Sequence, residues 1–162
     1  MDMTHQIHEF APVYDGTSEI LILGTFPSVK SREQKFYYGH PQNRFWRVIA
    51  ALTDSEIPKE IDEKKNLLLK NHIAVWDVIE SCDIKGSSDS SIKNVVPCDI
   101  AGLLHKTRIK SLYANGTAAK RLYDRFILPK TQVPIILLPS TSPANAAYSV
   151  ERLIKSWSVI HF

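Results

Sequence analysis

The sequence of 162 residues is poor in cysteine, glycine and methionine, and it contains no long apolar run. Its two cysteines, Cys82 and Cys98, are too few for a disulfide framework or a four-thiolate iron–sulfur cluster, so we expect two free thiols in a reducing compartment. No segment approaches the roughly 18 apolar residues of a membrane span, and the first ten residues carry charges where a signal peptide needs an apolar stretch. These absences favour a cytoplasmic protein, associated with the nucleoid or, in a eukaryote, nuclear.

The common signatures of nucleotide and metal sites are also absent. Neither a G-x-G-x-x-G stretch nor a G-K-[ST] element follows the first apolar run, so we expect no nucleotide cofactor. His5 and His8 have a spacing that metal ligands can have, but no third candidate ligand lies near them. We therefore expect no metal and no other cofactor.

The composition is that of a globular protein, with 44% apolar residues, 23% charged residues and a formal net charge of +3. A chain of this length buries roughly 70% of its unfolded surface, so we expect a single domain over residues 1–162 and a monomer. Basic residues are concentrated in two segments: residues 30–47 hold five with one acid, and residues 104–130 hold seven with one acid. Such segments are typical of a protein that binds a polyanion, and an ordinary solvated surface is the alternative.

Apolar runs and helical segments alternate along the chain. Strands are predicted at 20–23, 73–76, 111–114 and 134–138, and helices at 44–52, 61–70, 100–106, 117–126 and 143–157. This alternation predicts an α/β fold in which helices cover both faces of a parallel sheet. Residues 85–93 are predicted to form a loop, and residues 7–14 a short edge strand.

Small and polar residues follow each predicted strand. They are the segments 24–28, 115–117 and 139–143, together with Asp77. Ligands of open α/β sheets bind at the carboxyl ends of the strands, so we expect these residues to share one site. Helices that begin at Gly116 and Pro143 would direct backbone N–H groups toward an anion such as phosphate. The alternative is that these residues only form turns, with Ser142 and Pro143 as the first two positions of a helix.

Residues 36–46 are the most unusual stretch, with five aromatic side chains among eleven residues. Aromatic faces can stack on nucleobases, while His40 and Asn43 can hydrogen bond to a base edge or a water. The alternative is that Phe45 and Trp46 belong to the core and that Asn43 only caps the following helix.

These segments carry a resemblance to a known family. The stretches Gly-Thr-Phe-Pro-Ser at 24–28, His-Pro-Gln-Asn-Arg-Phe-Trp at 40–46 and Pro-Ser-Thr-Ser-Pro at 139–143 resemble the uracil-DNA glycosylase superfamily. Residues 36–46, 85–90 and 138–145 are more similar to its hypoxanthine (deoxyinosine) branch than to its mismatch-specific uracil branch. The resemblance implies a three-layer α/β/α sandwich around a four-stranded parallel sheet, and an enzyme that hydrolyses N-glycosidic bonds in DNA.

One position departs from the superfamily pattern. Members that remove uracil usually carry Asp or Asn at the third position of the first stretch, where it holds the attacking water, and this sequence has Phe26 there. The hypoxanthine branch is similar in placing this role on the asparagine of the second stretch. The resemblance therefore implies that Asn43 is the catalytic residue and leaves Phe26 free to stack on the base.

The remaining expected roles divide between the base and the DNA backbone. We expect base contacts from Gly24, Thr25, Phe26, Tyr38, Asp77 and Ser140, and phosphate contacts from Ser28, Arg44, Ser142 and Asn145. Asp77 could accept the N1–H of hypoxanthine; alternatively it caps local backbone groups. The expected partner is DNA that contains a deaminated base. Two other functions stay open: a G:U or G:T mismatch-specific uracil/thymine glycosylase, and a damaged-DNA-binding module without catalysis.

Overall fold

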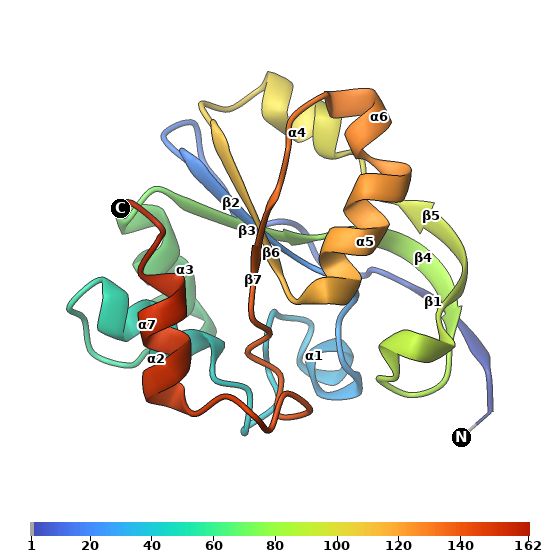
Figure 1. Cartoon of the computed structure of the whole chain (residues 1–162), viewed down its shortest axis with the longest axis horizontal. Helices are drawn as coiled ribbons and strands as arrows, with labels where there is room; N and C mark the ends of the chain where they lie inside the picture. Colours follow the sequence, from blue (N-terminus) through green and yellow to red (C-terminus); the bar gives the residue numbers. More distant parts are fainter. Residues whose placement is uncertain (1) are drawn as a thin grey trace.

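A four-stranded parallel sheet forms the centre of the protein, in a computed structural model that describes residues 2–162 (Figure 1). Its strands are β2 (Ile20–Gly24), β3 (Ile73–Asp77), β6 (Ser111–Asn115) and β7 (Ile136–Leu138), in the order β3-β2-β6-β7. The predicted parallel sheet is confirmed; β7 begins two residues later than the sequence pattern indicated.

Apolar side chains of the strands alternate between two buried clusters, one on each face of the sheet. Ile20 and Ile22 belong to the first cluster, and Leu21 and Leu23 to the second, with each side chain at most 5% exposed. The first cluster includes residues of α2 (Phe45–Leu52), α3 (Ile61–Lys70) and α7 (Val150–Trp157). The second includes residues of α4 (Ile100–His105), α5 (Thr117–Phe126) and α6 (Leu128–Thr131). The expected three-layer α/β/α sandwich is therefore confirmed (Figure 1).

Four of the five predicted helices are confirmed, and the start of the fifth is wrong. Helix α7 begins at Val150 rather than at residue 143, and its first turn is capped by Ser149, whose Oγ accepts from the N–H of Arg152 at 3.1 Å. The residues before it form an irregular loop. The helix N-terminus that was expected to direct backbone N–H groups toward a phosphate at Pro143 is therefore absent there. Within residues 2–162, no helix combines the length and the apolar content needed to cross a membrane.

A second sheet was not predicted. It is antiparallel, in the order β1 (Thr4–Ile7), β4 (Ile79–Ile84) and β5 (Lys93–Pro97). The predicted edge strand at 7–14 is wrong, because only its first residue lies in β1 and the next pairing is an isolated bridge between Val13 and Val75. Most of the predicted loop at 85–93 is confirmed, with a single 3₁₀ turn, η1 (Asp89–Ser91), inside it.

Strand β4 follows β3 after one residue, Val78, so the two sheets share one continuous stretch of chain. This continuity places the loop after β4 beside the carboxyl end of β3. The short helix α1 (Val29–Gln34) follows β2 at the same end of the sheet (Figure 1). Both cysteines are free, as expected, and both are buried.

Candidate active site

A pocket of about 130 Å³ lies at the carboxyl ends of the central strands. The last residues of β2, β3 and β6 all line it: Gly24, Asp77 and Asn115. Of the residues expected at the site, the lining includes Gly24, Thr25, Phe26, Ser28, Tyr38, Asn43, Asp77, Ser140 and Ser142. Three further lining residues, Pro27, Asn115 and Thr141, belong to the segments that were expected to share the site, and Tyr37 belongs to the aromatic stretch 36–46. The sequence indicated no role at the site for the remaining lining residues, which are Ser31, Ser87 and Asp89. Arg44 and Asn145 are not among the lining residues; Asn145 borders an adjoining hollow that also involves Ser140 and Ser142.

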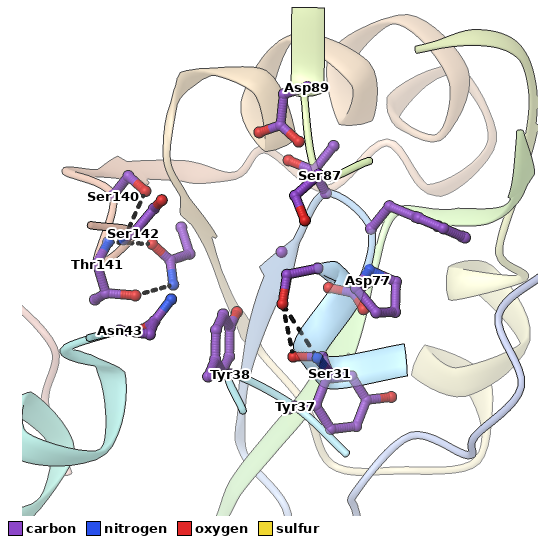
Figure 2. A pocket seen from close by; sticks show the side chains of 16 residues that line it. Ser31, Tyr37, Tyr38, Asn43, Asp77, Ser87, Asp89, Ser140, Thr141 and Ser142 are labelled. Carbon is purple, nitrogen blue, oxygen red and sulfur yellow. Dashed lines mark hydrogen bonds between the residues drawn. The ribbon is translucent and has the colours of Figure 1, made fainter. Parts of the chain in front are cut away.

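Asn43 lies at the pocket wall immediately before helix α2, beside Tyr38 (Figure 2). Its Oδ1 accepts a hydrogen bond of 2.9 Å from the backbone N–H of Phe45. The capping role that was the alternative is therefore present, and it coexists with a place in the pocket. A carboxamide oxygen has two lone pairs, so the second lone pair can still accept from a water.

The loop after β7 is tied to the end of β6 and to the Asn43 segment. Asn115 donates from Nδ2 to Thr141 Oγ1 at 3.0 Å, and its Oδ1 accepts from the Thr141 N–H at 3.0 Å. The carbonyl of Thr141 also accepts from the backbone N–H of Arg44 at 3.1 Å. These bonds bring segments that are about a hundred residues apart to one wall of the pocket.

Arg44 holds this loop with its guanidinium group. Nη2 donates to the carbonyl of Ser142 at 2.7 Å and to that of Asn145 at 3.0 Å, Nε donates to the carbonyl of Thr141 at 3.3 Å, and Nη1 donates to the carbonyl of Tyr148. A guanidinium has five N–H donors, so one remains. Because only one donor is left, Arg44 cannot bind a phosphate through two parallel hydrogen bonds in this arrangement.

The other three residues expected to contact phosphate also have partners within the protein. Ser28 Oγ accepts from the N–H of Ser31 at 3.2 Å and caps α1. Ser142 Oγ accepts from the N–H of Ala144 at 3.2 Å, and Asn145 donates from Nδ2 to the Ser140 carbonyl at 3.0 Å. Their contacts with DNA stay predictions.

Tyr38 is held in an unusual backbone conformation, with φ at +51°. Its ring stacks on Phe45, with ring centroids 4.1 Å apart. Its hydroxyl is buried and has no hydrogen-bond partner among residues 2–162. Burial, and secondarily the charge of Asp77, raise the pKa of this phenol far above its usual value. The hydroxyl therefore stays protonated and is an available donor.

Asp77 and His8 form a buried pair behind the pocket. His8 Nε2 lies 2.8 Å from Asp77 Oδ2, and the two side chains are 2% and 5% exposed. The partner of the carboxylate is thus a histidine and not the backbone groups that the capping alternative required. His8 follows β1, and its backbone N–H donates to the carbonyl of Glu80 on β4 at 2.7 Å. Since the pair joins residues 69 positions apart, no local pattern indicated it.

Replacing Gly24 by alanine is expected to slow the N-glycosidic hydrolysis that the family resemblance implies by about 10- to 100-fold. Displacing reacting groups by even 1 Å has effects of this size. A Cβ at Gly24 would overlap Asp77 Oδ1 and lie 3.0 Å from the Tyr38 hydroxyl. Gly16→Ala is the matched control, since no atom lies within 4 Å of its added Cβ. Single-turnover rates measure the effect, and equal rates for the two variants would contradict it.

Asp89 lies at one end of the pocket, on η1 (Figure 2). Desolvation, and secondarily the charge of Asp77, raise the pKa of its carboxyl from 3.8 to about 6. Because the folded-state pKa exceeds the unfolded value, ionisation disfavours the folded state increasingly between about pH 4 and pH 6 and fully above pH 6, and it has little effect below pH 4.

Asp89→Asn is therefore expected to increase the free energy of unfolding at pH 8 and to leave it unchanged at pH 4. Although Asp89 borders the pocket, the residue as a whole is exposed, so screening by solvent limits the gain to about 1 kcal/mol or less. Urea unfolding of both proteins at the two pH values checks this. A gain of equal size at pH 4 would show that the charge is not its cause.

Comparisons with known proteins agree with this architecture. The family model of the uracil DNA glycosylase superfamily matches residues 11–160. A hypoxanthine DNA glycosylase of Methanosarcina acetivorans is 35% identical over 145 residues, which is 88% of this chain and 90% of that protein. A hypoxanthine DNA glycosylase of Methanosarcina barkeri is 36% identical over 86 residues, covering 52% of this chain and 54% of that protein.

A solved structure shows the same fold. The solution structure of a candidate uracil DNA glycosylase from Methanosarcina acetivorans superimposes with a TM-score of 0.80 at 32% identity, and the match covers 93% of each chain. Together with the match over nearly the whole sequence, this likeness confirms the resemblance carried by the three stretches around the pocket: the chain belongs to the uracil DNA glycosylase superfamily.

Proposed function

We propose that this protein is a monofunctional DNA glycosylase that hydrolyses the N-glycosidic bond of hypoxanthine in DNA containing deoxyinosine. The observation that carries the proposal is the pair of groups that converge at Gly24. A Cβ there would meet both Asp77 Oδ1 and the Tyr38 hydroxyl, so an acceptor and an unpartnered donor lie close together at the inner end of the pocket. The names of the two Methanosarcina relatives support the same substrate.

The pair complements the edge of hypoxanthine. The N1–H of this base is a donor and the adjacent O6 is an acceptor, so Asp77 Oδ1 accepts the first and the Tyr38 O–H donates to the second. Phe26, which is 9% exposed and lines the pocket, supplies an aromatic face for the extruded base. Uracil is matched less well, because its N3–H is flanked by carbonyl oxygens on both sides and one of them would face the carboxylate.

The hydrolysis follows from the groups at the wall of the pocket. The C1′–N9 bond breaks and its electron pair stays on the base, which leaves an oxocarbenium-like sugar. Water, held by Asn43 Oδ1, adds to C1′ and loses a proton, and the base gains one on leaving. A neutral amide is a weak base, so bond breaking precedes water capture.

Backbone donors stabilise the charge that develops on the leaving base. The N–H groups of Thr141 and Ser142 are already bound to Asn115 Oδ1 and Ser140 Oγ, at 3.0 and 3.1 Å. We therefore assign this role to the N–H groups of Thr25 and Phe26, which lie beside the pocket after β2.

The proposal is tested by incubating the protein with matched oligonucleotides that contain inosine, uracil or a G:T mismatch. Alkali then breaks each strand at an abasic site. We expect breaks at inosine. Breaks only at uracil or at mismatched thymine would identify a mismatch-specific glycosylase instead, and intact strands with every lesion would identify a binding module.

Asp77→Asn is expected to slow hypoxanthine release by about 10- to 100-fold, as for the loss of a hydrogen bond to a charged group. In this variant, His8 Nε2–H still donates to the carbonyl oxygen of the new amide. The amide NH₂ therefore faces the N1–H of the base, and two donors oppose each other. Single-turnover rates on inosine DNA measure this. An unchanged rate would remove Asp77 from base recognition.

A further inference from the structure

We propose that His8 is a positioning residue that lets Asp77 accept hypoxanthine and reject guanine. This inference rests on the proposed function and extends it to the base that a hypoxanthine glycosylase must avoid. Guanine differs from hypoxanthine only by an amino group at C2, beside N1. The two bases therefore present the same N1–H and O6 to Asp77 and Tyr38.

A free carboxylate favours guanine. Its two oxygens can accept from the N1–H and the amino group side by side, so an unrestrained aspartate at this position would bind the normal base better than the damaged one. The structure turns only one of the two oxygens toward the pocket. Asp77 Oδ2 is bonded to His8 Nε2 at 2.8 Å, and Oδ1 is the oxygen that a Cβ on Gly24 would meet.

His8 is held on the side of Asp77 away from the pocket. It is not among the residues that line the pocket, and its ring lies in an aromatic cluster, 4.5 Å from Phe10, 5.8 Å from Tyr37 and 6.1 Å from Phe26 between ring centroids. Because a carboxylate only accepts hydrogen bonds, Nε2 carries the proton. His8 Nδ1 is buried without a partner among residues 2–162, so the ring has one polar contact, and that contact fixes the carboxylate.

The single oxygen that faces the pocket matches hypoxanthine. It accepts the N1–H, and the C2–H beside it needs no partner. Guanine would bury its amino group where the second oxygen is held turned toward His8 and away from the base, and a buried donor without an acceptor is strongly disfavoured. Discrimination against guanine thus depends on a residue that never touches the base.

The test compares four variants with the parent on single strands, where no base pair has to be broken. His8→Leu and His8→Phe fill the aromatic cluster but cannot donate to Asp77, and His8→Gln retains a donor. His5→Leu is the matched control, since His5 is exposed and pairs with Asp83 on β4. Binding is measured with 2′-fluoro-deoxyinosine and 2′-fluoro-deoxyguanosine strands, in which fluorine prevents cleavage, and release rates with the ordinary nucleotides.

We expect His8→Leu and His8→Phe to lower the inosine-to-guanine ratio of binding constants by about tenfold or more. His8→Gln should restore the parent ratio to within about threefold, and His5→Leu should not change it. A parent that releases hypoxanthine, together with folded His8→Leu and His8→Phe variants that keep its ratio, overturns the inference alone. A parent that neither releases hypoxanthine nor prefers the inosine strand overturns the proposed function as well.

Discussion

Replacing Asn43 by alanine is expected to lower the single-turnover rate of hypoxanthine release by about 10²- to 10⁴-fold, the range for loss of a group that assists proton transfer and positions a reactant. Alanine has no polar atom to hold the water against C1′. The same change removes the cap on the Phe45 N–H, whose bond to Asn43 Oδ1 is 2.9 Å long. This lost cap destabilises the fold by about 1 kcal/mol, so activity must be measured where both proteins are fully folded.

Asn43→Ser separates the two effects. A serine hydroxyl can cap the helix as well as asparagine does, but it is too short to reach a water in the pocket. We therefore expect Asn43→Ser to unfold at nearly the parent urea concentration and to release hypoxanthine as slowly as Asn43→Ala. If the serine variant retained the parent rate, capping would be the whole role of Asn43.

Replacing Arg44 by methionine is expected to reduce the free energy of unfolding by about 3 kcal/mol. Hydrogen bonds to charged groups contribute about 1.5–3 kcal/mol each and do not add fully, and Arg44 makes four such bonds to carbonyls between Thr141 and Tyr148. Methionine retains much of the aliphatic length but leaves these carbonyls without their donor. Urea unfolding, followed by a probe of tertiary structure, measures the loss.

Arg47→Met is the matched control, because Arg47 lies in the first turn of α2, the helix that begins directly after Arg44, and is exposed. We expect its free energy of unfolding to stay within about 0.5 kcal/mol of the parent. The alternative role of Arg44, a phosphate contact, has a different signature. If Arg44 bound phosphate instead, Arg44→Met would leave the urea unfolding curve unchanged. The slope of the logarithm of the DNA-binding constant against the logarithm of salt concentration would become shallower by about one phosphate contact.

The central sheet could be predicted from sequence because its strands are buried on both faces and appear as short apolar runs. The second sheet could not. The buried residues of its strand β4, Ile79, Cys82 and Ile84, do not alternate regularly with exposed ones, and this weaker signal directly follows the strong run of β3. The start of α7 was wrong for another reason. Ser142 and Pro143 have the sequence of a helix start, but carbonyls that a helix would use are bound by Arg44, about a hundred residues away.

Most of the pocket could be predicted because parallel strands end at one edge of the sheet. Gly24 and Asp77 are paired neighbours in the register of β2 and β3, so their meeting follows from topology alone. His8 could not be found this way, because it reaches Asp77 through the pairing of β1 with β4. The mutual bonds of Asn115 and Thr141 depend likewise on the path of the loop after β7.

The contacts of Arg44 bear on how this protein can evolve. Its guanidinium binds only main-chain oxygens of the segment after β7, so these four bonds do not depend on the side chains that the segment carries. Ala144, Ala146 and Ala147 carry small side chains there. Mutation can therefore vary the surface that this segment offers to a bound duplex while its backbone stays in place, and new lesion preferences can arise without a new scaffold.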